Sequence, residues 1–306
     1  MQIHQDWQWL APAARGASVA MGNFDGVHLG HQSVIDLARG KGPLGVITFE
    51  PHPRQVFTPE GPAFRLMNAE SRANRLAKLG VDHLFQIQFN RALAALTPED
   101  FAARVLAEGL GIRHIVVGAD FCFGAGRAGT ANDLKALGDR LGFETTIAPL
   151  IAIEGHEVSS TAIRRALSEG RPRDAAAMLG HLHRIEGEVI HGEKRGRELG
   201  FPTANMALTG LHLPKFGVYA ARVDVLSGPQ QGSYLGAASL GVRPMFDGEV
   251  PNIETYLLDF KGDLYGHHLS VALVDYLRPE MKFDGLDALI TQMNADCAQA
   301  RQILTD

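Results

Sequence analysis

A segment near the start of the chain, GNFDGVHLGHQ at residues 22–32, combines glycines with two histidines. Its glycines let the backbone turn tightly and approach a ligand, and the helical pattern that follows offers free amide groups and partial positive charge to a phosphate. His28 and His31 share one face of a helical turn, where two imidazoles can stabilise charge on a leaving pyrophosphate. The segment therefore predicts phosphate binding at Gly22, Asn23, Phe24, Gly26, His28, Gly30 and His31.

A second segment, GEVIHGEKRGRELGFPTANM at residues 187–206, joins a glycine-rich basic loop to hydroxyl and amide side chains. Taken alone, the loop fits an ordinary polar hairpin, but its charge and flexibility also suit a flap over phosphates. Thr203 and Asn205 supply oxygen atoms, which are the ligands that Mg²⁺ prefers when it carries ATP phosphates. The loop positions predicted to bind phosphate are Gly192, Lys194, Arg195 and Gly196.

A third segment, VSSTAIRRAL at residues 158–167, has the pattern of a helix start. Its hydroxyl side chains can accept hydrogen bonds from the first free amides of a helix, which is the usual role of such a cap. Arg164 falls in the first turn, where its guanidinium can reach ATP phosphates. The ATP-binding positions predicted here are Ser159, Ser160, Thr161 and Arg164.

Short apolar runs alternate with helical patterns up to about residue 180. Such alternation requires crossover connections, so it predicts a Rossmann-like α/β domain, a parallel sheet flanked by helices, over residues 1–182. In such a sheet ligands bind outside the carboxyl ends of the strands. The predicted strands are 17–21, 44–49, 83–89 and 114–118, and the predicted helices lie near 30–40, 70–79, 98–109 and 131–141.

Strand-like runs then follow one another with little helix between them, which predicts an antiparallel sheet or β-barrel over residues 183–306. The linker between the two domains is predicted at 170–183. A terminal helix is expected from Asp284 onward, because apolar residues recur there at helical spacing. The strand-like runs are 184–191, 217–226, 233–240, 253–260 and 269–277, and the apolar face of the helix comprises Leu286, Leu289, Ile290, Met293 and Cys297.

Together these motifs resemble those of a known enzyme family. The histidine segment resembles the HxGH signature of nucleotidylyltransferases and, in its full length, their bacterial FAD synthetase branch, which SSTAIR at 159–164 also fits. FPTAN at 201–205 resembles the motif of riboflavin kinases, and the similarity extends through 213–223, 236–248 and 251–260. Because the matches follow one another over nearly the whole chain, the sequence resembles the bacterial bifunctional riboflavin kinase/FAD synthetases.

The resemblance implies that the second domain phosphorylates riboflavin with ATP and that the first transfers the adenylyl group of ATP to FMN. An alcohol is a poor nucleophile without a base, and the resemblance assigns that role to Glu254. The FMN phosphate is already largely ionised at neutral pH, so His28 and His31 are expected to stabilise charge as catalytic groups, not to abstract a proton. Mg²⁺ with ATP is the implied cofactor, held by Thr203 and Asn205. The implied flavin-binding positions are Pro51, His52, Asp120, Phe121, Phe123 and Arg243.

One position departs from the family pattern. Gly129 is followed by Thr130, where the pattern has aspartate. Thr130 can still cap the helix that follows. The departure therefore affects only the expected contacts of this loop.

Composition and charge narrow the range of partners. Hydrophobic residues are 45% and charged residues 21%, as in an ordinary globular protein, and a net charge of −5 gives no general attraction to nucleic acid or to an anionic membrane. Cys122 and Cys297 form no metal or redox spacing, and no segment approaches the ~20 apolar residues of a membrane span. We expect a cytoplasmic protein whose partners are riboflavin, FMN and ATP, without nucleic acid or membrane. The oligomeric state stays open, a homo-oligomer included.

Two alternatives remain from the sequence alone. A monofunctional nucleotidylyltransferase with another acceptor, of the pantetheine-phosphate or nicotinamide-mononucleotide type, would share the histidine motif but would not need FPTAN or the NIET sequence at 252–255. A flavin-binding module that regulates a partner would not need an intact set of catalytic groups. Analysis of the products formed from ATP and riboflavin distinguishes these alternatives from the bifunctional enzyme.

Overall fold

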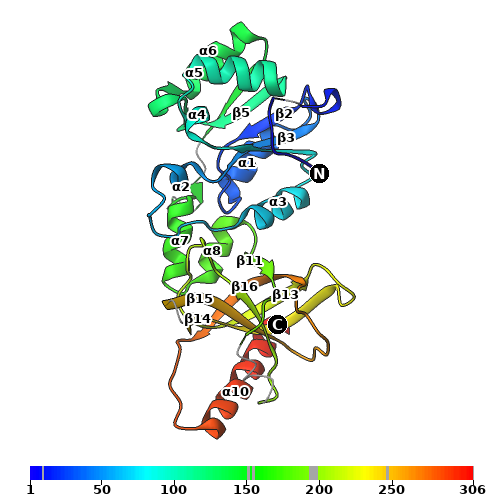
Figure 1. Cartoon of the computed structure of the whole chain (residues 1–306), viewed down its shortest axis with the longest axis vertical. Helices are drawn as coiled ribbons and strands as arrows, with labels where there is room; N and C mark the ends of the chain where they lie inside the picture. The colour runs from blue at the N-terminus through cyan, green and yellow to red at the C-terminus, as the bar shows by residue number, and fades with distance from the viewer. Residues whose placement is uncertain (9, 150–151, 154–155, 193–198, 246–247, 306) are drawn as a thin grey trace. The chain divides into compact units, whose positions relative to one another are not determined.

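Two compact units make up the chain in the computed structural model (Figure 1). Contacts group Met1–Pro62 with Arg72–Val158 in the first unit, and Ala63–Ser71 with Ser159–Asp306 in the second. By contacts, therefore, residues 159–182 belong to the second unit, and the domain boundary after residue 182 stays a prediction. The structure describes residues 1–8, 10–149, 152–153, 156–192, 199–245 and 248–305.

A six-stranded parallel sheet forms the centre of the first unit, with strand order β1-β4-β3-β2-β5-β8. The alternating sequence pattern predicted this architecture, and the four predicted strands are present. The short strands β1 and β8, at the two edges of the sheet, were not predicted. The strands are β1 (Gln2–His4), β2 (Ser18–Met21), β3 (Leu44–Glu50), β4 (His83–Gln88), β5 (His114–Gly118) and β8 (Glu144–Ala148).

Helices cover both faces of this sheet. In β2 all four residues are buried, as expected for a parallel strand that is covered on both sides. Val19, Ile47 and Ile115 pack in one cluster with residues of the helices at 101–110 and 131–141, whereas α1 contacts β2, β5 and β8. The helices are η1 (Pro12–Ala14), α1 (Leu29–Leu37), α2 (Pro53–Phe57), α3 (Ala69–Lys78), α4 (Arg91–Ala94), α5 (Pro98–Asp100), the π-helix η2 (Phe101–Leu110), η3 (Ala125–Arg127) and α6 (Ala131–Leu141).

Two small hairpins complete the first unit. Strands β6 (Cys122–Phe123) and β7 (Gly129–Thr130) pair in one, and β9 (Ala152–Ile153) and β10 (His156–Glu157) pair in the other. Thr130 accepts from the backbone amide of Asp133 and so caps α6, as predicted for the residue that departs from the family pattern.

The second unit contains a six-stranded antiparallel sheet in the order β11-β16-β13-β14-β15-β12. An isolated bridge between Ile190, just after β11, and Asn205 in β12 joins the two ends of that order, so the sheet closes as a barrel. The five predicted runs are confirmed, while β12, which contains the end of FPTAN, was not predicted as a strand. The strands are β11 (His183–Glu188), β12 (Thr203–Ala207), β13 (Gly217–Val225), β14 (Gly232–Met245), β15 (Gly248–Leu257) and β16 (His268–Arg278).

Helices α7 (Ser160–Ser168) and α8 (Pro172–Leu179) precede the barrel. Helix α8 lies within the predicted linker, 170–183. It forms because proline occupies its first turn, Ala175 and Leu179 are buried, and Gly180 ends it in the left-handed conformation. The segment between the two predicted domains is therefore structured and packed.

The terminal helix α10 (Leu286–Thr305) packs on β13, β14 and β16, as Figure 1 shows. Its buried residues are Asp296, Ala300 and Leu304, whereas Leu286, predicted on the buried face, is 62% exposed. The first turns of the helix extend away from the strands, which explains the difference (Figure 1). Asp296 is buried because its carboxylate accepts hydrogen bonds from the Arg278 guanidinium at 2.7–3.0 Å.

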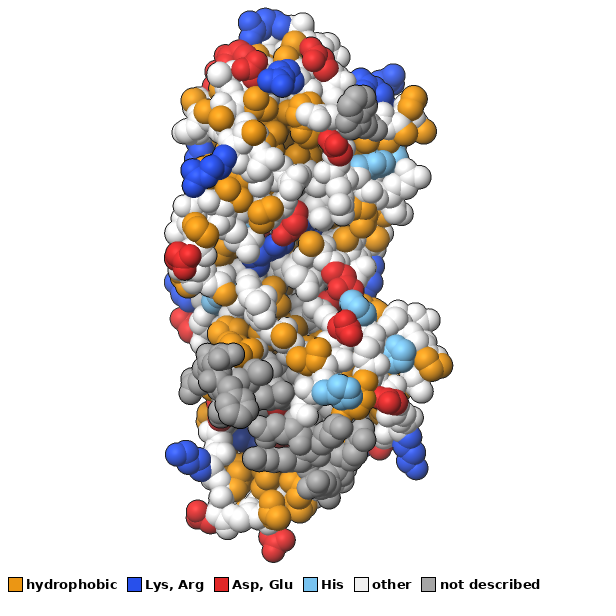
Figure 2. Space-filling model, in the orientation of Figure 1, with side chains coloured by type: hydrophobic (Ala, Val, Ile, Leu, Met, Phe, Trp, Pro, Cys, Tyr) orange, Lys and Arg blue, Asp and Glu red, His pale blue; other side chains and the backbone are white. Residues whose placement is uncertain are grey.

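The described part of the chain contains no helix with the length and apolar character needed to cross a bilayer. On the face shown in Figure 2, Lys and Arg side chains are interspersed with Asp and Glu.

Candidate active sites

The carboxyl edge of the parallel sheet brings together three segments that the sequence singled out. The chain runs from β2 to β3 on one side and places β5 on the other side of β2, so the strand order reverses between β2 and β5. Such a reversal opens a crevice at the carboxyl ends of the strands, where α/β proteins bind ligands. The segments that leave β2, β3 and β5 at this edge begin at Gly22, Pro51 and Ala119.

The loop from Gly22 to His28 follows β2 and has an unusual backbone. Phe24 and Val27 have positive φ angles of 50° and 45°, which are strained for residues with a side chain, and Gly26 has a φ of 89°. The carbonyl of Asn23 accepts hydrogen bonds from Thr48 Oγ1 at 3.2 Å and from Arg72 Nη1 at 3.4 Å. These donors fix the loop that presents the histidines.

Arg72 is a buried cation beside this loop. Its side chain is 1% exposed, and its Nη2 lies 2.9 Å from the Glu50 carboxylate at the end of β3. The guanidinium therefore ties the segment after β2 to the end of β3. Arg72 was not predicted as a site residue, since an arginine within an amphipathic helix gives no signal that distinguishes it from a surface charge.

The two histidines form one stacked pair at the start of α1. His28 is the N-cap, and its Nδ1 accepts a hydrogen bond from the His31 amide at 3.3 Å. The ring centroids lie 3.6 Å apart with an interplanar angle of 19°. Gly30 allows this packing: a Cβ there would lie 3.1 Å from the His28 ring. The sequence prediction that both imidazoles share one face is confirmed.

The surroundings of His31 disfavour its protonated form. Burial lowers the pKa of His31 well below its usual value, and the neighbouring His28 lowers it further. Its Nδ1 is buried and has no hydrogen-bond partner in the described part of the chain. A neutral ring at this position can donate one hydrogen bond to a bound phosphate and is a poor proton acceptor at neutral pH.

The positions implied to bind flavin in the first unit differ in exposure. Pro51 is exposed and follows a cis peptide bond, and His52 caps α2 by accepting from the Arg54 amide at 3.1 Å. Asp120 is exposed after β5. Phe121 is partly buried, whereas Phe123 is 7% exposed and packs in the core, with its ring centroid 5.9 Å from that of Phe101 and the two rings tilted by 55°.

The third motif starts α7, which belongs to the second unit. Ser159 caps this helix, because its Oγ accepts from the Ala162 amide at 3.3 Å, and the predicted cap is confirmed. Arg164 Nε donates to the Phe64 carbonyl at 2.6 Å, and its guanidinium carbon lies 5.6 Å from the centroid of the Phe64 ring. Ser160 and Thr161 lie in the first turn of the helix.

In the barrel, the three residues predicted for the kinase site converge. Asn205 in β12 lies directly opposite Glu254 in β15, and Thr203 lies opposite Tyr256. Directly opposed residues of an antiparallel pair share a face, so Thr203, Asn205 and Glu254 lie on one side of the sheet. The intervening residues Ala204, Met206 and Ile253 form part of the barrel core. The three predicted residues therefore face outward from that core.

Hydrogen bonds connect these polar side chains. Asn205 Nδ2 lies 3.4 Å from Thr203 Oγ1, and Asn252 Nδ2 lies 3.4 Å from Asn205 Oδ1 and 3.3 Å from Glu254 Oε1. Asn252 was not predicted as a site residue. Its place two residues before Glu254 on a strand was the available signal, because residues at that spacing share a face.

The glycine-rich loop is described only at its ends. A Cβ on Gly192 would lie 2.7–2.9 Å from the Asn205 side chain, so only glycine lets the backbone pass this close. The predicted phosphate-binding residues Lys194, Arg195 and Gly196 lie outside the described residues. Arg243 pairs with Val250 through the backbone of β14, and its side chain lies outside the described part of the structure.

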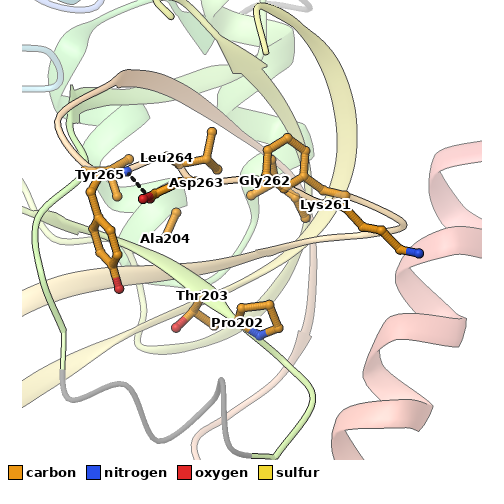
Figure 3. A pocket seen from close by; sticks show the side chains of 11 residues that line it. Pro202, Thr203, Ala204, Lys261, Gly262, Asp263, Leu264 and Tyr265 are labelled. Atoms are coloured by element: carbon orange, nitrogen blue, oxygen red, sulfur yellow. Dashed lines mark hydrogen bonds between the residues drawn. The ribbon is translucent and has the colours of Figure 1, made fainter. Parts of the chain in front are cut away.

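A cavity of about 210 Å³ lies beside Thr203 (Figure 3). Apolar side chains of Val189, Leu257 and Leu264 line it together with Phe260 and Tyr265. Asp263 Oδ1 accepts from the Tyr265 amide at 3.1 Å and holds the turn that forms one wall, while the Lys261 side chain points away from the other labelled residues (Figure 3).

The donor set of the barrel site fits magnesium carried by a nucleotide. Thr203 and Asn205 provide two neutral oxygens, and the described residues contain no cluster of three or more His, Cys, Asp or Glu that could hold an ion. Mg²⁺ demands oxygen ligands and is commonly held by few protein groups together with substrate phosphates. The described side chains therefore suit an ion that arrives with ATP.

Comparisons with known proteins match both halves of the chain. The family model for FAD synthetase matches residues 10–162, and the model for riboflavin kinase matches residues 179–304. A bifunctional riboflavin kinase/FMN adenylyltransferase from Pseudomonas fluorescens is 40% identical over 309 residues, covering 99% of this chain and 98% of the relative. The chain belongs to the bifunctional riboflavin kinase/FMN adenylyltransferase family.

Further relatives support the same family assignment. Enzymes of the same name are 38% identical in Escherichia coli K12, covering 94% of this chain and 92% of the relative, and 36% identical in Bacillus subtilis 168, covering 92% and 90%. A crystal structure described as a macrolide-efflux protein from Streptococcus pneumoniae superposes with a TM-score of 0.80 at 34% identity, covering 94% of each chain. The predicted family, fold class and pair of activities, riboflavin kinase and FAD synthetase, are confirmed, and the two alternatives considered from the sequence are set aside.

Proposed function

We propose that each activity resides in one unit: the barrel phosphorylates riboflavin to FMN, and the parallel-sheet unit adenylylates FMN to FAD. Each uses its own molecule of ATP. The observation that supports this division most directly is the pairing of Asn205 with Glu254 across β12 and β15, which puts an oxygen ligand beside a carboxylate. The stacked histidine pair supports the second assignment, because it places two imidazoles at the start of a helix.

In the kinase step, Glu254 acts as the general base. Its carboxylate accepts the proton of the riboflavin ribityl hydroxyl as that oxygen bonds to the γ-phosphorus of ATP, and the bond between this phosphorus and the bridging oxygen breaks to release ADP. Thr203 and Asn205 would hold the magnesium ion that accompanies the ATP phosphates. That ion, when bound, neutralises charge on the phosphates.

The cavity beside Thr203 is proposed to receive the nucleotide of the kinase step. Its aliphatic and aromatic lining suits a planar base, and Thr203 lies at its margin next to the predicted phosphate ligands. The backbone at Gly192, a few residues after β11, lies close to the Asn205 side chain. Thr203 is the residue shared by the cavity lining and the predicted ligands, so the phosphates are proposed to leave the cavity past Thr203.

In the adenylyl step no strong base is required. A phosphate oxygen of FMN attacks the α-phosphorus of ATP, and the bond from this phosphorus to the β-phosphate oxygen breaks to release pyrophosphate. His28, His31 and the start of α1 stabilise the negative charge that develops on the leaving group. The segments after β3 and β5, which contain Pro51, His52, Asp120 and Phe121, are proposed to hold the flavin at the same edge of the sheet.

Substitutions confined to one unit at a time test the division of labour. The His28→Ala/His31→Ala variant, given riboflavin, ATP and Mg²⁺, should accumulate FMN without FAD. Glu254→Gln should form no FMN from riboflavin but still convert added FMN to FAD. Loss of both activities by either folded variant would contradict the assignment.

The cellular setting is proposed from the state of the thiols and from the charge of the chain. Both cysteines are free thiols, which suits the reducing cytoplasm, and Mg²⁺ is the expected metal. The negative net charge and the mixed charges on the face shown in Figure 2 support small molecules, not nucleic acid, as partners. The oligomeric state, including a homo-oligomer, is a matter for measurement by light scattering.

A further inference from the structure

Asn252 stands between the two groups proposed to act in the kinase step. Its side-chain Nδ2 carries two hydrogens and lies within hydrogen-bond distance of two acceptors, Asn205 Oδ1 at 3.4 Å and Glu254 Oε1 at 3.3 Å. The residue is 9% exposed and Asn205 is 5% exposed, so water has little access to either amide. A buried donor that reaches both groups limits the directions in which each can turn.

These contacts set the orientation of the Asn205 amide. The oxygen of Asn205 faces the Asn252 donor, while its nitrogen faces the hydroxyl and carbonyl of Thr203. A flipped amide would place two donors against each other at Asn252. The oxygen, which is the atom able to bind a cation, is thereby directed to the side on which Glu254 lies.

The strand around Asn252 indicates that packing alone does not require asparagine. The residues opposite it are Ala207 on β12 and Gly241 on β14, which are small. Asparagine is disfavoured in strands, where β-branched and aromatic residues pack better. The next residue, Ile253, is fully buried in the barrel core and supplies the packing of this part of β15.

We propose that Asn252 is a positioning residue for the kinase reaction, which holds the Asn205 oxygen and the Glu254 carboxylate in one fixed relation. This inference rests on the proposed roles of Asn205 and Glu254. Loss of an outer partner of a metal ligand or of a reacting group commonly lowers metal affinity or activity by about 10–100-fold. Removal of the Asn252 amide should therefore affect two quantities together: kcat, through Glu254, and the Mg²⁺ concentration needed for half-maximal rate, through Asn205.

The test uses the full chain with Asn252→Ala, Asn252→Asp and, as a matched control, Ile253→Val. The control alters the adjacent residue on the opposite face of the same strand and leaves the polar contacts in place. Riboflavin kinase rates are measured over a range of Mg²⁺ concentrations, and FAD formation from added FMN reports the integrity of the rest of the chain. Thermal unfolding of each variant accompanies the rates.

We expect Asn252→Ala to lower kinase kcat and to raise the Mg²⁺ requirement, each by about tenfold or more, with unchanged adenylyl transfer. Asn252→Asp keeps the shape but replaces the donor with a carboxylate, so it should be at least as impaired. Ile253→Val should keep wild-type kcat and Mg²⁺ dependence even where its melting temperature falls.

Two results separate the possible failures. If Glu254→Gln abolishes the kinase reaction while Asn252→Ala keeps wild-type kcat and Mg²⁺ dependence, the positioning role is overturned and the proposed function stands. If Glu254→Gln itself keeps full kinase activity, the proposed function fails first. A loss in Asn252→Ala matched by the same loss in Ile253→Val would also overturn the proposal, because it would reflect strand stability only.

Discussion

Replacement of Gly30 by alanine should weaken adenylyl transfer without destabilising the protein. Gly30 lies in the first turn of α1, and its φ is not in the positive range, so its backbone accepts an L-residue. Alanine is favoured over glycine within helices by roughly 0.5–1 kcal/mol, which acts to stabilise α1. The added Cβ, however, would lie 3.1 Å from Cε1 and Nδ1 of His28.

The size of the effect follows from this contact. Ordinary van der Waals contact for a Cβ begins at 3.4 Å, so the His28 ring must move by a few tenths of an ångström. A displacement of about 1 Å at a reacting centre can cost about 100-fold in rate, so about 0.3 Å corresponds to roughly fourfold. The shift also disturbs the stack with His31, whose ring centroid is 3.6 Å away.

The assay measures pyrophosphate release from ATP and FMN, with riboflavin phosphorylation in the same chain as internal control. Gly187→Ala serves as the matched glycine control, because the nearest atom to its added Cβ is Met206 Sδ at 4.0 Å. We expect a reduced rate of FAD formation, an unchanged kinase rate and an unfolding temperature at or above that of wild type. A Gly30→Ala enzyme with full adenylyl activity would refute the claim that the histidine stack sets the rate of this step.

Three further predictions concern the barrel. Gly192→Ala would bring a Cβ within 2.7–2.9 Å of the Asn205 amide, so the Asn205 side chain must move. On the scale of about 100-fold in rate for a displacement of about 1 Å, kinase activity should fall by about tenfold or more, while FAD formation from FMN continues. Burial lowers the pKa of His183 to about 3, with His181 and His212 adding to the effect. As pH falls, His183 takes up a proton in the unfolded chain at a higher pH than in the folded chain. The free energy of unfolding should therefore decrease below about pH 6.5, by at most about 1.4 kcal/mol per pH unit, and urea unfolding of His183→Leu should depend less on pH. Asp296→Ala leaves the Arg278 guanidinium, 16% exposed, without its carboxylate and should lower the free energy of unfolding in urea by about 3 kcal/mol. Arg301→Gln, at an exposed pair with Asp259, should cost much less. Equal losses in the two variants would contradict the distinction between buried and exposed pairs.

The sequence predicted the architecture well because hydrophobic periodicity is strong in both units. Parallel strands buried on both faces, such as β2, appear as short continuous apolar runs, and these were found. The edge strand β1 and the strand β12 were not predicted, since Gln2–His4 and Thr203–Ala207 contain no long apolar run. The exposure of Leu286 was also not predicted, because periodicity does not report that the first turns of α10 extend away from the strands (Figure 1).

For the candidate sites, too, the sequence predicted local groupings of residues but not contacts between distant elements. Residues within a contiguous motif, such as His28 with His31 or Thr203 with Asn205, could be grouped from spacing alone. Arg72 could not be grouped in this way, because its contact with the Asn23 carbonyl depends on how distant elements meet in space. Spacing on a strand links Asn252 to Glu254, but its contact with Asn205 depends on the pairing of two strands. The register that sets Asn205 opposite Glu254 is likewise a property of the folded sheet.

The bridge between Ile190 and Asn205, here called the seam, is the place where the first and last strands of the barrel's strand order meet. The same asparagine carries the amide oxygen proposed for the kinase site, so local opening of this seam would take apart the barrel closure and the reaction centre in one event. A nucleotide bound at the seam would have to be released before the strands separate there. Nucleotide bound at the kinase site should therefore stabilise the closed barrel. The Ile190 amide donates to the Asn205 carbonyl at 2.8 Å, and its hydrogen exchange with solvent should slow when the nucleotide is bound.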